Sequence, residues 1–167
     1  METKIIFAKV KMGARIPTKR NEDAGFDIYP CFEDDYMVIK PHETKMIATG
    51  IASRCSEDYC FVLKERGSTG TKGIAQRCGI IDSNYNGEWF VPVTNTTDQY
   101  LIIYKSYINP DEIQTITKKK VAYPYDKAIT QALIIPVPKV DVEEVTYEEL
   151  LAVPTNRGDG CLGSSGK

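Results

Sequence analysis

The chain has 167 residues and a net charge of −2, and 42% of its residues are hydrophobic. This length suits one domain that buries roughly two-thirds of the surface its unfolded chain exposes. The balanced charge excludes a strong overall attraction to nucleic acid or to an anionic membrane, so an anionic ligand has to be held locally.

The N-terminal stretch, residues 1–11, alternates charged and apolar side chains and lacks the apolar core of a signal peptide. No stretch reaches the roughly 18 to 20 apolar residues that a membrane span requires. The five cysteines form no C-x-x-C pair, and the only histidine, His42, has no cysteine near it in sequence. We therefore expect a cytoplasmic protein without a structural zinc site, whose thiols are partly buried and inert.

Strand signals dominate the chain. Short runs rich in Ile, Val, Tyr and Phe end at turn residues and predict the strands Ile5 to Val10, Thr44 to Thr49, Tyr59 to Leu63, Trp89 to Val93, Leu101 to Tyr104 and Ala132 to Val137. Crossover helices are missing, so the pattern favours an all-β sandwich or barrel, such as an antiparallel jelly roll, over a parallel α/β sheet. A short helix is predicted near Thr146, because Thr146 and Glu149 have capping-box spacing; we expect Leu150 and Leu151 to cover apolar surface.

Two segments depart from this pattern. The segment 100–127 contains several tyrosines and three consecutive lysines, 118–120, and we expect a solvated loop there. An extra hairpin and a surface for a protein partner are the alternatives. The last residues, 157–167, are rich in glycine and hold little that could anchor a core, which predicts a β domain at 1–156 followed by a mobile C-terminal arm.

Five short segments carry candidate chemistry. The first is Asp23-Ala24-Gly25-Phe26-Asp27, where Gly25 permits close backbone packing and Asp27 begins a strand. The second is Glu65-Arg66-Gly67-Ser68-Thr69-Gly70, whose fixed positive charge, hydroxyls and glycines suit a phosphate oxygen. It is not a Walker loop, because no G-K-[ST] follows. Taken alone, the first segment is a turn and the second a surface loop.

The third segment, Gly79 to Trp89, predicts a β-hairpin. Strand residues lead to Asp82, Asn86-Gly87 supplies the turn, and a second strand begins at Trp89. A carboxylate at a strand end, with Tyr85 three residues later, can present a base beside a flat ligand. A purely structural hairpin is the alternative.

The last two segments lie near the C-terminus. Gln131 precedes the apolar run 132–135, where a polar side chain usually satisfies backbone groups. Arg157 begins a glycine-rich end whose backbone N–H groups, hydroxyls and guanidinium can wrap a polyphosphate. A C-terminal tail that binds no ligand does not require this arrangement of glycines, hydroxyls and an arginine.

In this order the five segments resemble the five motifs of the trimeric dUTPase family, from Asp23 to Gly166. The third is similar to the family's G-x-I-D-x-x-Y-x-G, and the fifth to R-G-x-x-G-F-G-S-[ST]-G. The resemblance implies a dUTPase-like jelly roll of the β-clip type, assembled as a homotrimer, that hydrolyses dUTP to dUMP and pyrophosphate with Mg²⁺. It also implies active sites between subunits, with the C-terminal arm exchanged between them.

The resemblance further implies a role for each matching residue. Asp82 matches the general base that activates water, and Asp27 the aspartate that reaches Mg²⁺ through water. Tyr85 would pack beneath the deoxyribose, the backbone from Gly79 through Ile80 to Ile81 would pair with uracil, and Gln76 stands where some members place an amide on the base. The remaining substrate contacts implied are Arg66, Gly67, Ser68, Thr69, Gln131, Arg157, Gly160, Leu162, Gly163, Ser164 and Ser165.

Three positions depart from the family's pattern. Gly67 separates Arg66 from Ser68, so the substrate-facing hydroxyl is either Ser68 or Thr69. Ala128 stands in place of an arginine, with the charge of Lys127 next to it. Leu162 replaces an aromatic residue, which removes a stacking contribution of about 1 to 3 kcal/mol from the closed arm.

Two alternatives share this scaffold. A dCTP deaminase, or a bifunctional deaminase-dUTPase, needs a glutamate at the cytosine amine, and Glu88 is the candidate in the third segment. A regulatory protein would use the same fold to bind a protein partner through residues 100–127.

Overall fold

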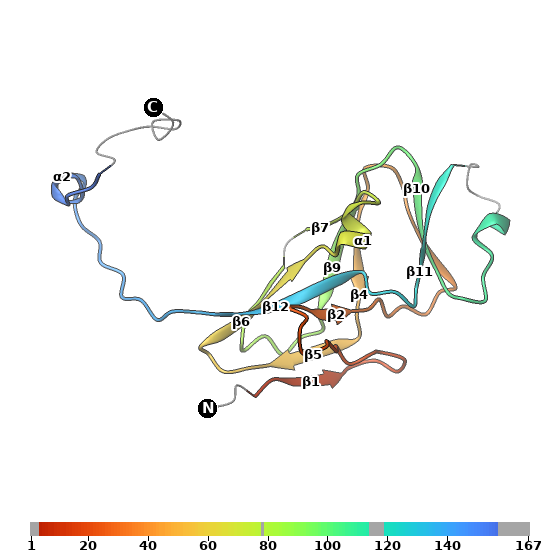
Figure 1. The fold of residues 1–167 in the computed structure, drawn as a ribbon, viewed down its shortest axis with the longest axis horizontal. Coiled ribbons are helices and arrows are strands. Elements are labelled where there is room, and N and C mark those ends of the chain that lie inside the picture. Colours follow the sequence, from red (N-terminus) through yellow and green to blue (C-terminus); the bar gives the residue numbers. More distant parts are fainter. Residues whose placement is uncertain (1–3, 78, 114–118, 157–167) are drawn as a thin grey trace. The chain divides into compact units, whose positions relative to one another are not determined.

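The structure is a computed structural model that describes residues 4–77, 79–113 and 119–156. The chain forms two compact units, Met1–Val137 and Pro138–Lys167. The first unit is almost entirely β (Figure 1). Its elements are β1 (Ile6–Lys9), β2 (Phe26–Ile28), β3 (Tyr36–Ile39), β4 (Thr44–Ala48), β5 (Ile51–Arg54), β6 (Tyr59–Lys64), α1 (Gly67–Gly70), β7 (Ile74–Gln76), β8 (Ile80–Ile81), β9 (Phe90–Asn95), β10 (Tyr100–Tyr104), the 3₁₀ turn η1 (Pro110–Glu112), β11 (Lys120–Pro124) and β12 (Thr130–Pro136).

The strands of the described residues pair into four small sheets. Their orders are β1-β5, β11-β10-β3, β2-β12-β6-β8 and β4-β9-β7. Every ladder is antiparallel except that between β10 and β11. The sequence-based expectation of a mostly β fold is therefore confirmed, and all six predicted strands are present with ends shifted by at most two residues.

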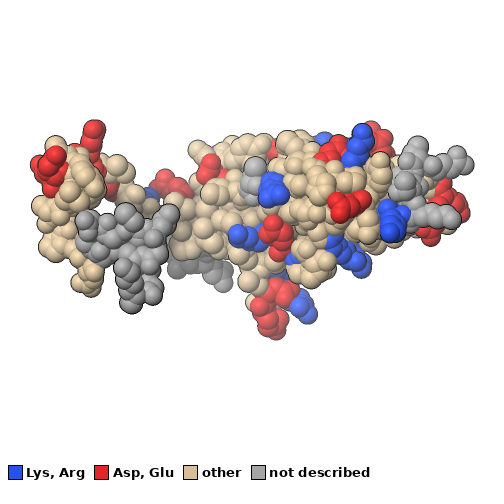
Figure 2. Space-filling view, turned by 90° about the horizontal axis from the view of Figure 1, so that it is seen from above, with Lys and Arg blue, Asp and Glu red and all other residues tan. Residues whose placement is uncertain are grey.

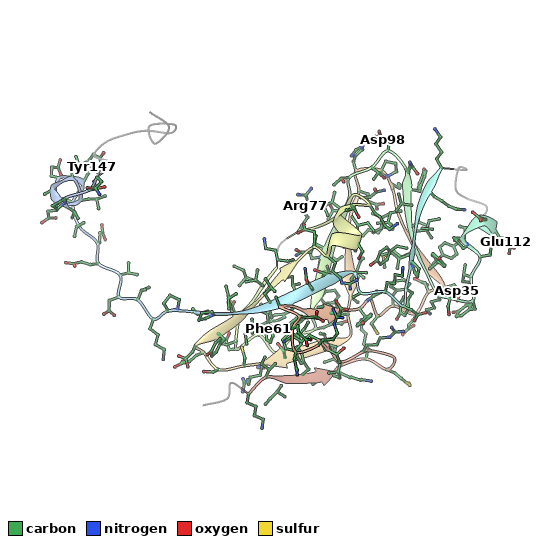
Figure 3. All side chains as sticks on the ribbon, viewed as in Figure 1. Asp35, Phe61, Arg77, Asp98, Glu112 and Tyr147 are labelled. Carbon is green, nitrogen blue, oxygen red and sulfur yellow. The ribbon has the colours of Figure 1, made fainter. Side chains whose placement is uncertain are left out.

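An aromatic cluster occupies the core of this unit. The ring centroids of Phe61 and Trp89 lie 5.0 Å apart, and Phe7 packs 5.6 Å from Phe61 and 5.8 Å from Trp89. Phe61 and Trp89 are fully buried, and Figure 3 shows Phe61 inside the unit, surrounded by side chains from several strands. Because Phe61 lies on β6, this cluster anchors the strand that leads directly to Arg66.

The segment from Gly79 to Trp89 is not the predicted hairpin. β8 pairs with β6, whereas β9 pairs with β4 and β7 in another sheet. A turn in which the Tyr85 N–H donates to the Asp82 carbonyl (3.1 Å) begins the connection between the two sheets. The turn is therefore centred on Ser83 and Asn84 rather than on the predicted Asn86-Gly87, and the strands on either side of the connection have different partners.

Among the described residues of segment 100–127, the two ends form neither the expected solvated loop nor a hairpin. β10 and β11 pair in parallel, with Ile102 opposite Ala122, and Leu101, Ile102, Ile103 and Tyr123 are buried. β3 covers the other edge of β10. Asp35 and Glu112 are both at the end of the unit that carries this sheet (Figure 3). The ends of the segment are thus part of the core, and a role in partner binding stays a prediction.

The second unit contains the predicted helix, α2 (Tyr147–Ala152). Its capping box is confirmed: the Thr146 hydroxyl accepts from the Glu149 N–H at 3.2 Å, and a Glu149 carboxylate oxygen accepts from the Thr146 N–H at 2.8 Å. Within the described part of the second unit, taken by itself, nothing buries Leu150 and Leu151. The expectation that they cover apolar surface stays a prediction. No helix in the described ranges is long and apolar enough to cross a membrane.

Charged side chains of both signs alternate over the face of the first unit seen in Figure 2. On this face the described Lys and Arg side chains lie among Asp and Glu side chains rather than in one broad basic area. Binding of a polyanion therefore depends on local groups.

Candidate active site

One half of the candidate site lies where β2, β12 and β6 run side by side. Asp27 on β2 is directly opposite Gln131 on β12, and Gln131 is also opposite Lys64 at the end of β6. Arg66 follows β6 as the N-terminal capping residue of α1. The antiparallel register thus brings three predicted residues, far apart in sequence, to one end of a sheet.

Arg66 forms a two-pronged ion pair with Asp27. The Nε atom donates to Oδ1 of Asp27 at 2.9 Å, and Nη2 donates to Oδ2 at 3.3 Å. Nη1 donates to the Ala128 carbonyl and to Ser68 Oγ, each at 3.4 Å. Both charged side chains are about one-third exposed (30% and 33%). The guanidinium is therefore held in a fixed orientation and still reaches the surface, as anion recognition requires.

Ser68 and Thr69 have different environments. The Thr69 side chain is fully buried, and its hydroxyl donates to the Arg66 carbonyl (2.9 Å) and accepts from the Arg66 N–H (3.1 Å). Thr69 thus closes the turn that carries Arg66 and presents no hydroxyl to a ligand. Ser68 is exposed, so of the two candidates Ser68 is the one that faces solvent.

Gln131 is fixed by its neighbours. Its Nε2 donates to the Glu65 carbonyl at 2.9 Å. Gly25 packs against the same side chain, since a β-carbon built on Gly25 would lie 2.8 Å from Gln131 Oε1. A residue larger than glycine does not fit there without displacing Gln131.

These residues line a cavity of about 670 Å³. Its polar lining contains three basic and three acidic side chains, Lys19, Arg20, Arg66, Glu22, Asp23 and Asp27. The first and second sequence segments and Gln131 thus meet in one place. Lys19 and Arg20 were not predicted; the signal that could have found them is two basic residues just before the first segment.

The other half of the site surrounds β8. Gly79, Ile80, Ile81, Asp82 and Tyr85 line a smaller pocket of about 270 Å³. Further apolar residues complete its wall, namely Met46, Leu63, Phe90 and Pro92. Sequence reasoning missed Met46 and Phe90, although apolar residues at exposed strand positions (61% and 38% exposed) are the kind of signal that marks a binding surface.

Gly79 is required by the backbone at the entrance of this pocket. Its φ is +140°, and its carbonyl accepts from the Leu63 N–H at 2.7 Å. A β-carbon at this position would lie 2.8 Å from Gln76 Nε2 and 3.0 Å from the Leu63 carbonyl oxygen. Gln76 is buried, and its Nε2 donates to the Arg77 carbonyl (2.9 Å). Gln76 therefore packs on the backbone of Gly79, beside the pocket.

Tyr85 and Glu88 shape the connection after Asp82. The Tyr85 hydroxyl donates to the Glu88 carbonyl (3.1 Å), and its ring lies so close to Gly87 that a β-carbon there would be 2.6 Å from the hydroxyl oxygen. The Glu88 carboxylate accepts from the Gly50 N–H (2.9 Å) and pairs with Lys11 (3.0 Å). Glu88 is thus engaged in holding the loop, and it does not line the described pocket.

The two halves are separate within one chain. Their cavities share no lining residue. Ile81 is opposite Phe61, and the extended stretch from Phe61 to Arg66 covers roughly 17 Å at about 3.3 Å per residue. Since β8 runs antiparallel to β6, Asp82 lies farther still, on the order of 20 Å from Arg66. One copy of the chain therefore does not bring Asp82 to Asp27 and Arg66.

The fifth predicted segment lies outside the described residues, so its predicted contacts Arg157, Gly160, Leu162, Gly163, Ser164 and Ser165 are not placed. Among the cysteines within the described ranges, Cys31 and Cys60 are buried and Cys55 is partly buried. Burial raises the pKa of the Cys55 and Cys60 thiols. A raised pKa makes both thiols poor nucleophiles.

The fold and the two half-sites together define a mostly β protein with an arginine-carboxylate cavity and a separate apolar pocket beside an exposed aspartate. This chain belongs to the dUTPase family: the model of that family, described as "dUTPase", matches residues 12–108.

Relatives and solved structures agree with this membership. The chain is 31% identical to a deoxyuridine 5'-triphosphate nucleotidohydrolase of Hydrogenobaculum sp. over 98% of both chains, and 32% identical to one of Nautilia profundicola over 98% of this chain and 99% of the relative. The dUTPase of Staphylococcus bacteriophage 80alpha with dUPNHPP matches with a TM-score of 0.76 at 23% identity, over 98% and 99% of the two chains. At that identity the last match shows the fold alone.

Proposed function

We propose that this dUTPase hydrolyses dUTP to dUMP and pyrophosphate at a site built from more than one copy of the chain. One copy contributes Asp27, Arg66, Ser68 and Gln131, and another contributes Asp82, Tyr85 and the Gly79–Ile81 backbone. Family membership supports the reaction. The observation that carries the assembly is the separation, on the order of 20 Å, between the two half-sites of a single chain.

The two halves have complementary chemistry. The small pocket has an apolar wall and exposed strand backbone, which suits a pyrimidine ring and a deoxyribose. The larger cavity has a fixed guanidinium, a serine hydroxyl and an amide, which suit phosphate oxygens. A nucleoside triphosphate that bridges both halves would place its α-phosphorus between them.

In the proposed reaction, Asp82 accepts a proton from a water molecule as the water oxygen bonds to the α-phosphorus. The bond between the α-phosphorus and its bridging oxygen to the β-phosphorus breaks, and pyrophosphate leaves. Arg66 and Ser68 neutralise and position the phosphates around that bond. Because phosphoryl chemistry depends mainly on positioning and charge neutralisation, few protein groups are needed.

The residues of this site fit a Mg²⁺ ion that is bound mainly by the substrate phosphates. In the described part of the chain, no three His, Cys, Asp or Glu side chains are grouped to hold a metal. Both oxygens of Asp27 already accept from Arg66, which suits contact with a hydrated ion through water. Mg²⁺ commonly keeps several waters and is bound by substrate phosphates with one or two carboxylates. When bound, it would neutralise phosphate charge, with Asp27 orienting its water shell.

The trimer, its jelly-roll subunits and the exchange of residues 157–167 between them are part of the same proposal, carried over from the family resemblance. The deaminase alternative is weaker, because Glu88 is tied to Gly50 and Lys11 rather than free beside the pocket.

Complementation between variants tests the composite site. Asp82→Asn and Arg66→Ala are each expected to be inactive on dUTP when pure. When the two variants are co-refolded, about a quarter of the sites at random mixing combine an intact Asp82 with an intact Arg66, so activity should return. Mixtures as inactive as the pure variants would contradict a site shared between copies. Wild-type protein that releases no dUMP from dUTP would overturn the activity itself.

A further inference from the structure

Lys19 and Arg20 line the same cavity as Asp27, Arg66 and Gln131, although they lie outside the five motif segments. They belong to the turn that precedes β2, where the Asp23 N–H donates to the Arg20 carbonyl at 3.2 Å. The turn therefore adds two basic and two acidic side chains to the lining of this cavity, Lys19, Arg20, Glu22 and Asp23.

Both arginines of this cavity are paired with a carboxylate. Arg66 is paired with Asp27, and Arg20 is paired with Asp23 through Nε to Oδ2 (3.0 Å) and Nη2 to Oδ1 (2.9 Å). The Arg20 side chain is 82% exposed. An exposed ion pair is held weakly, so a more highly charged phosphate group can replace the carboxylate as the partner of Arg20.

The turn itself is held independently of that ion pair. The Arg20 N–H donates to Asp23 Oδ2 (3.1 Å), and Lys19 Nζ donates to the carbonyls of Asp23 (2.9 Å) and Arg20 (3.3 Å). Hydrogen bonds from Arg20 hold the pKa of Asp23 at about 2, so Asp23 is ionised at any pH near neutrality. The guanidinium can thus change partner while the backbone keeps its shape.

Ala128 lies beside Arg66 and contributes no positive charge there. Ala128 is 2% exposed and offers only its carbonyl, which accepts from Arg66 Nη1 (3.4 Å) and from the Tyr123 hydroxyl (2.6 Å). A triphosphate carries more negative charge than Arg66 alone neutralises. The nearest additional guanidinium among the residues that line the cavity is Arg20.

We propose that Arg20 leaves Asp23 and binds the β- or γ-phosphate of dUTP, with the Lys19 ammonium beside it. Arg20 is then a substrate-binding residue, and Asp23 sets its resting position. This inference rests on the proposed function, because it assumes that the large cavity receives the triphosphate.

Calorimetric titration tests the inference without turnover. Four proteins are compared, namely wild type, Arg20→Ala, Asp23→Asn and the double variant, and each is titrated with inorganic tripolyphosphate and with dUMP. Asparagine keeps an oxygen for the Arg20 N–H but loses the charge. We expect Arg20→Ala to weaken tripolyphosphate binding about 10-fold, as for loss of a charged hydrogen bond, and to leave dUMP binding unchanged. Asp23→Asn should strengthen tripolyphosphate binding. In the Arg20→Ala background, the change in the logarithm of the affinity that Asp23→Asn causes should be smaller by at least about half.

Arg54→Ala, an exposed arginine on β5 away from this cavity, is the matched control for loss of one positive charge. Three outcomes would overturn the inference: tripolyphosphate affinity within about twofold of wild type in Arg20→Ala, an equal loss for tripolyphosphate and dUMP, or an Asp23→Asn effect independent of Arg20. Each is distinguishable from failure of the proposed function, which would appear as wild-type protein without dUTP hydrolysis.

Discussion

Gly25 and the side chain of Gln131 are in such close contact that a β-carbon at position 25 would lie 2.8 Å from Gln131 Oε1 and 3.1 Å from its Cβ. Because the near atoms include the Gln131 Cβ, rotation of the amide alone does not relieve the overlap. Gly25 therefore fixes where Gln131 lies, and Gln131 in turn donates to the Glu65 carbonyl beside Arg66.

Gly25→Ala should reduce dUTP hydrolysis by up to about 10²-fold, the size that a displacement of about 1 Å in a positioning group can cause. The melting temperature should fall as well, because Gly25 is buried and the overlap includes the Gln131 Cβ. Steady-state kinetics and thermal unfolding check both parts. Gly70→Ala is the matched control, since a β-carbon on Gly70 meets only the Glu65 Cβ, at 4.0 Å. Full activity in Gly25→Ala would show that the position of Gln131 is not critical.

Ser68 and Thr69 separate substrate binding from local stability. Ser68→Ala should raise KM for dUTP with little effect on unfolding, because Ser68 is exposed and its hydroxyl only accepts from Arg66 at 3.4 Å. Thr69→Val should lower stability by about 1 kcal/mol, typical of losing a capping residue, because the buried hydroxyl closes the Arg66 turn. Chemical denaturation and kinetics of both variants distinguish the roles. The reverse pattern would assign the substrate hydroxyl to Thr69.

Local sequence patterns predicted many of the strands of this fold, but they predicted less of which strands pair with one another. The apolar runs of β6, β9 and β12 are long enough for composition to mark them, whereas β2 and β8, of three and two residues, were indicated only within the first and third candidate segments. The strands β3, β5, β7 and β11 were missed. The Asn86-Gly87 pair suggested a hairpin, but the turn lies at Ser83-Asn84. Turn residues act locally, whereas the choice of strand partner depends on burial across the whole unit. The parallel pairing of β10 and β11 likewise leaves no mark in either strand's sequence.

The candidate site was predictable as a set of residues but not as a geometry. Asp27, Arg66 and Gln131 do meet in one cavity, and Gly79, Asp82 and Tyr85 in another. The motifs could not indicate which side chains already form hydrogen bonds or ion pairs within the protein. Thr69 closes a turn, and Glu88 holds Gly50 and Lys11, because hydrogen-bond partners depend on the tertiary fold.

Asp82→Asn should lower kcat by a factor of about 10² to 10⁴, the usual contribution of a general base. The change keeps the size of an exposed side chain, so affinity for a non-hydrolysable dUTP analogue should stay within about twofold of wild type. Single-turnover kinetics and calorimetry measure the two effects separately. Near-normal turnover in the variant would exclude Asp82 as the base.

Asp27→Asn should raise the Mg²⁺ concentration needed for half-maximal activity. The substitution removes the negative charge that faces the metal-triphosphate complex and also frees Arg66 from its ion pair. Titration of activity with Mg²⁺, after treatment of the protein with EDTA, gives the shift directly. Asp23→Asn, which changes another carboxylate of the same cavity, serves as control and should shift the Mg²⁺ requirement less. An equal shift in both variants would mean that the Mg²⁺ requirement depends only on the overall charge of the cavity and not on Asp27 in particular.

Tyr85 offers a test of sugar discrimination. Its ring covers Gly87 and lines the pocket next to Asp82, while its hydroxyl is used by the Glu88 carbonyl. If the ring excludes a 2′-hydroxyl by its bulk, Tyr85→Ala should bring kcat/KM for UTP closer to that for dUTP. We expect kcat/KM for dUTP to fall and kcat/KM for UTP to rise. Tyr85→Phe keeps the ring and removes only the bond to Glu88, so its preference for dUTP should remain. A Tyr85→Ala enzyme that rejects UTP as strongly as wild type would place the discrimination elsewhere, and the backbone around Gly79 would then be the next position to examine.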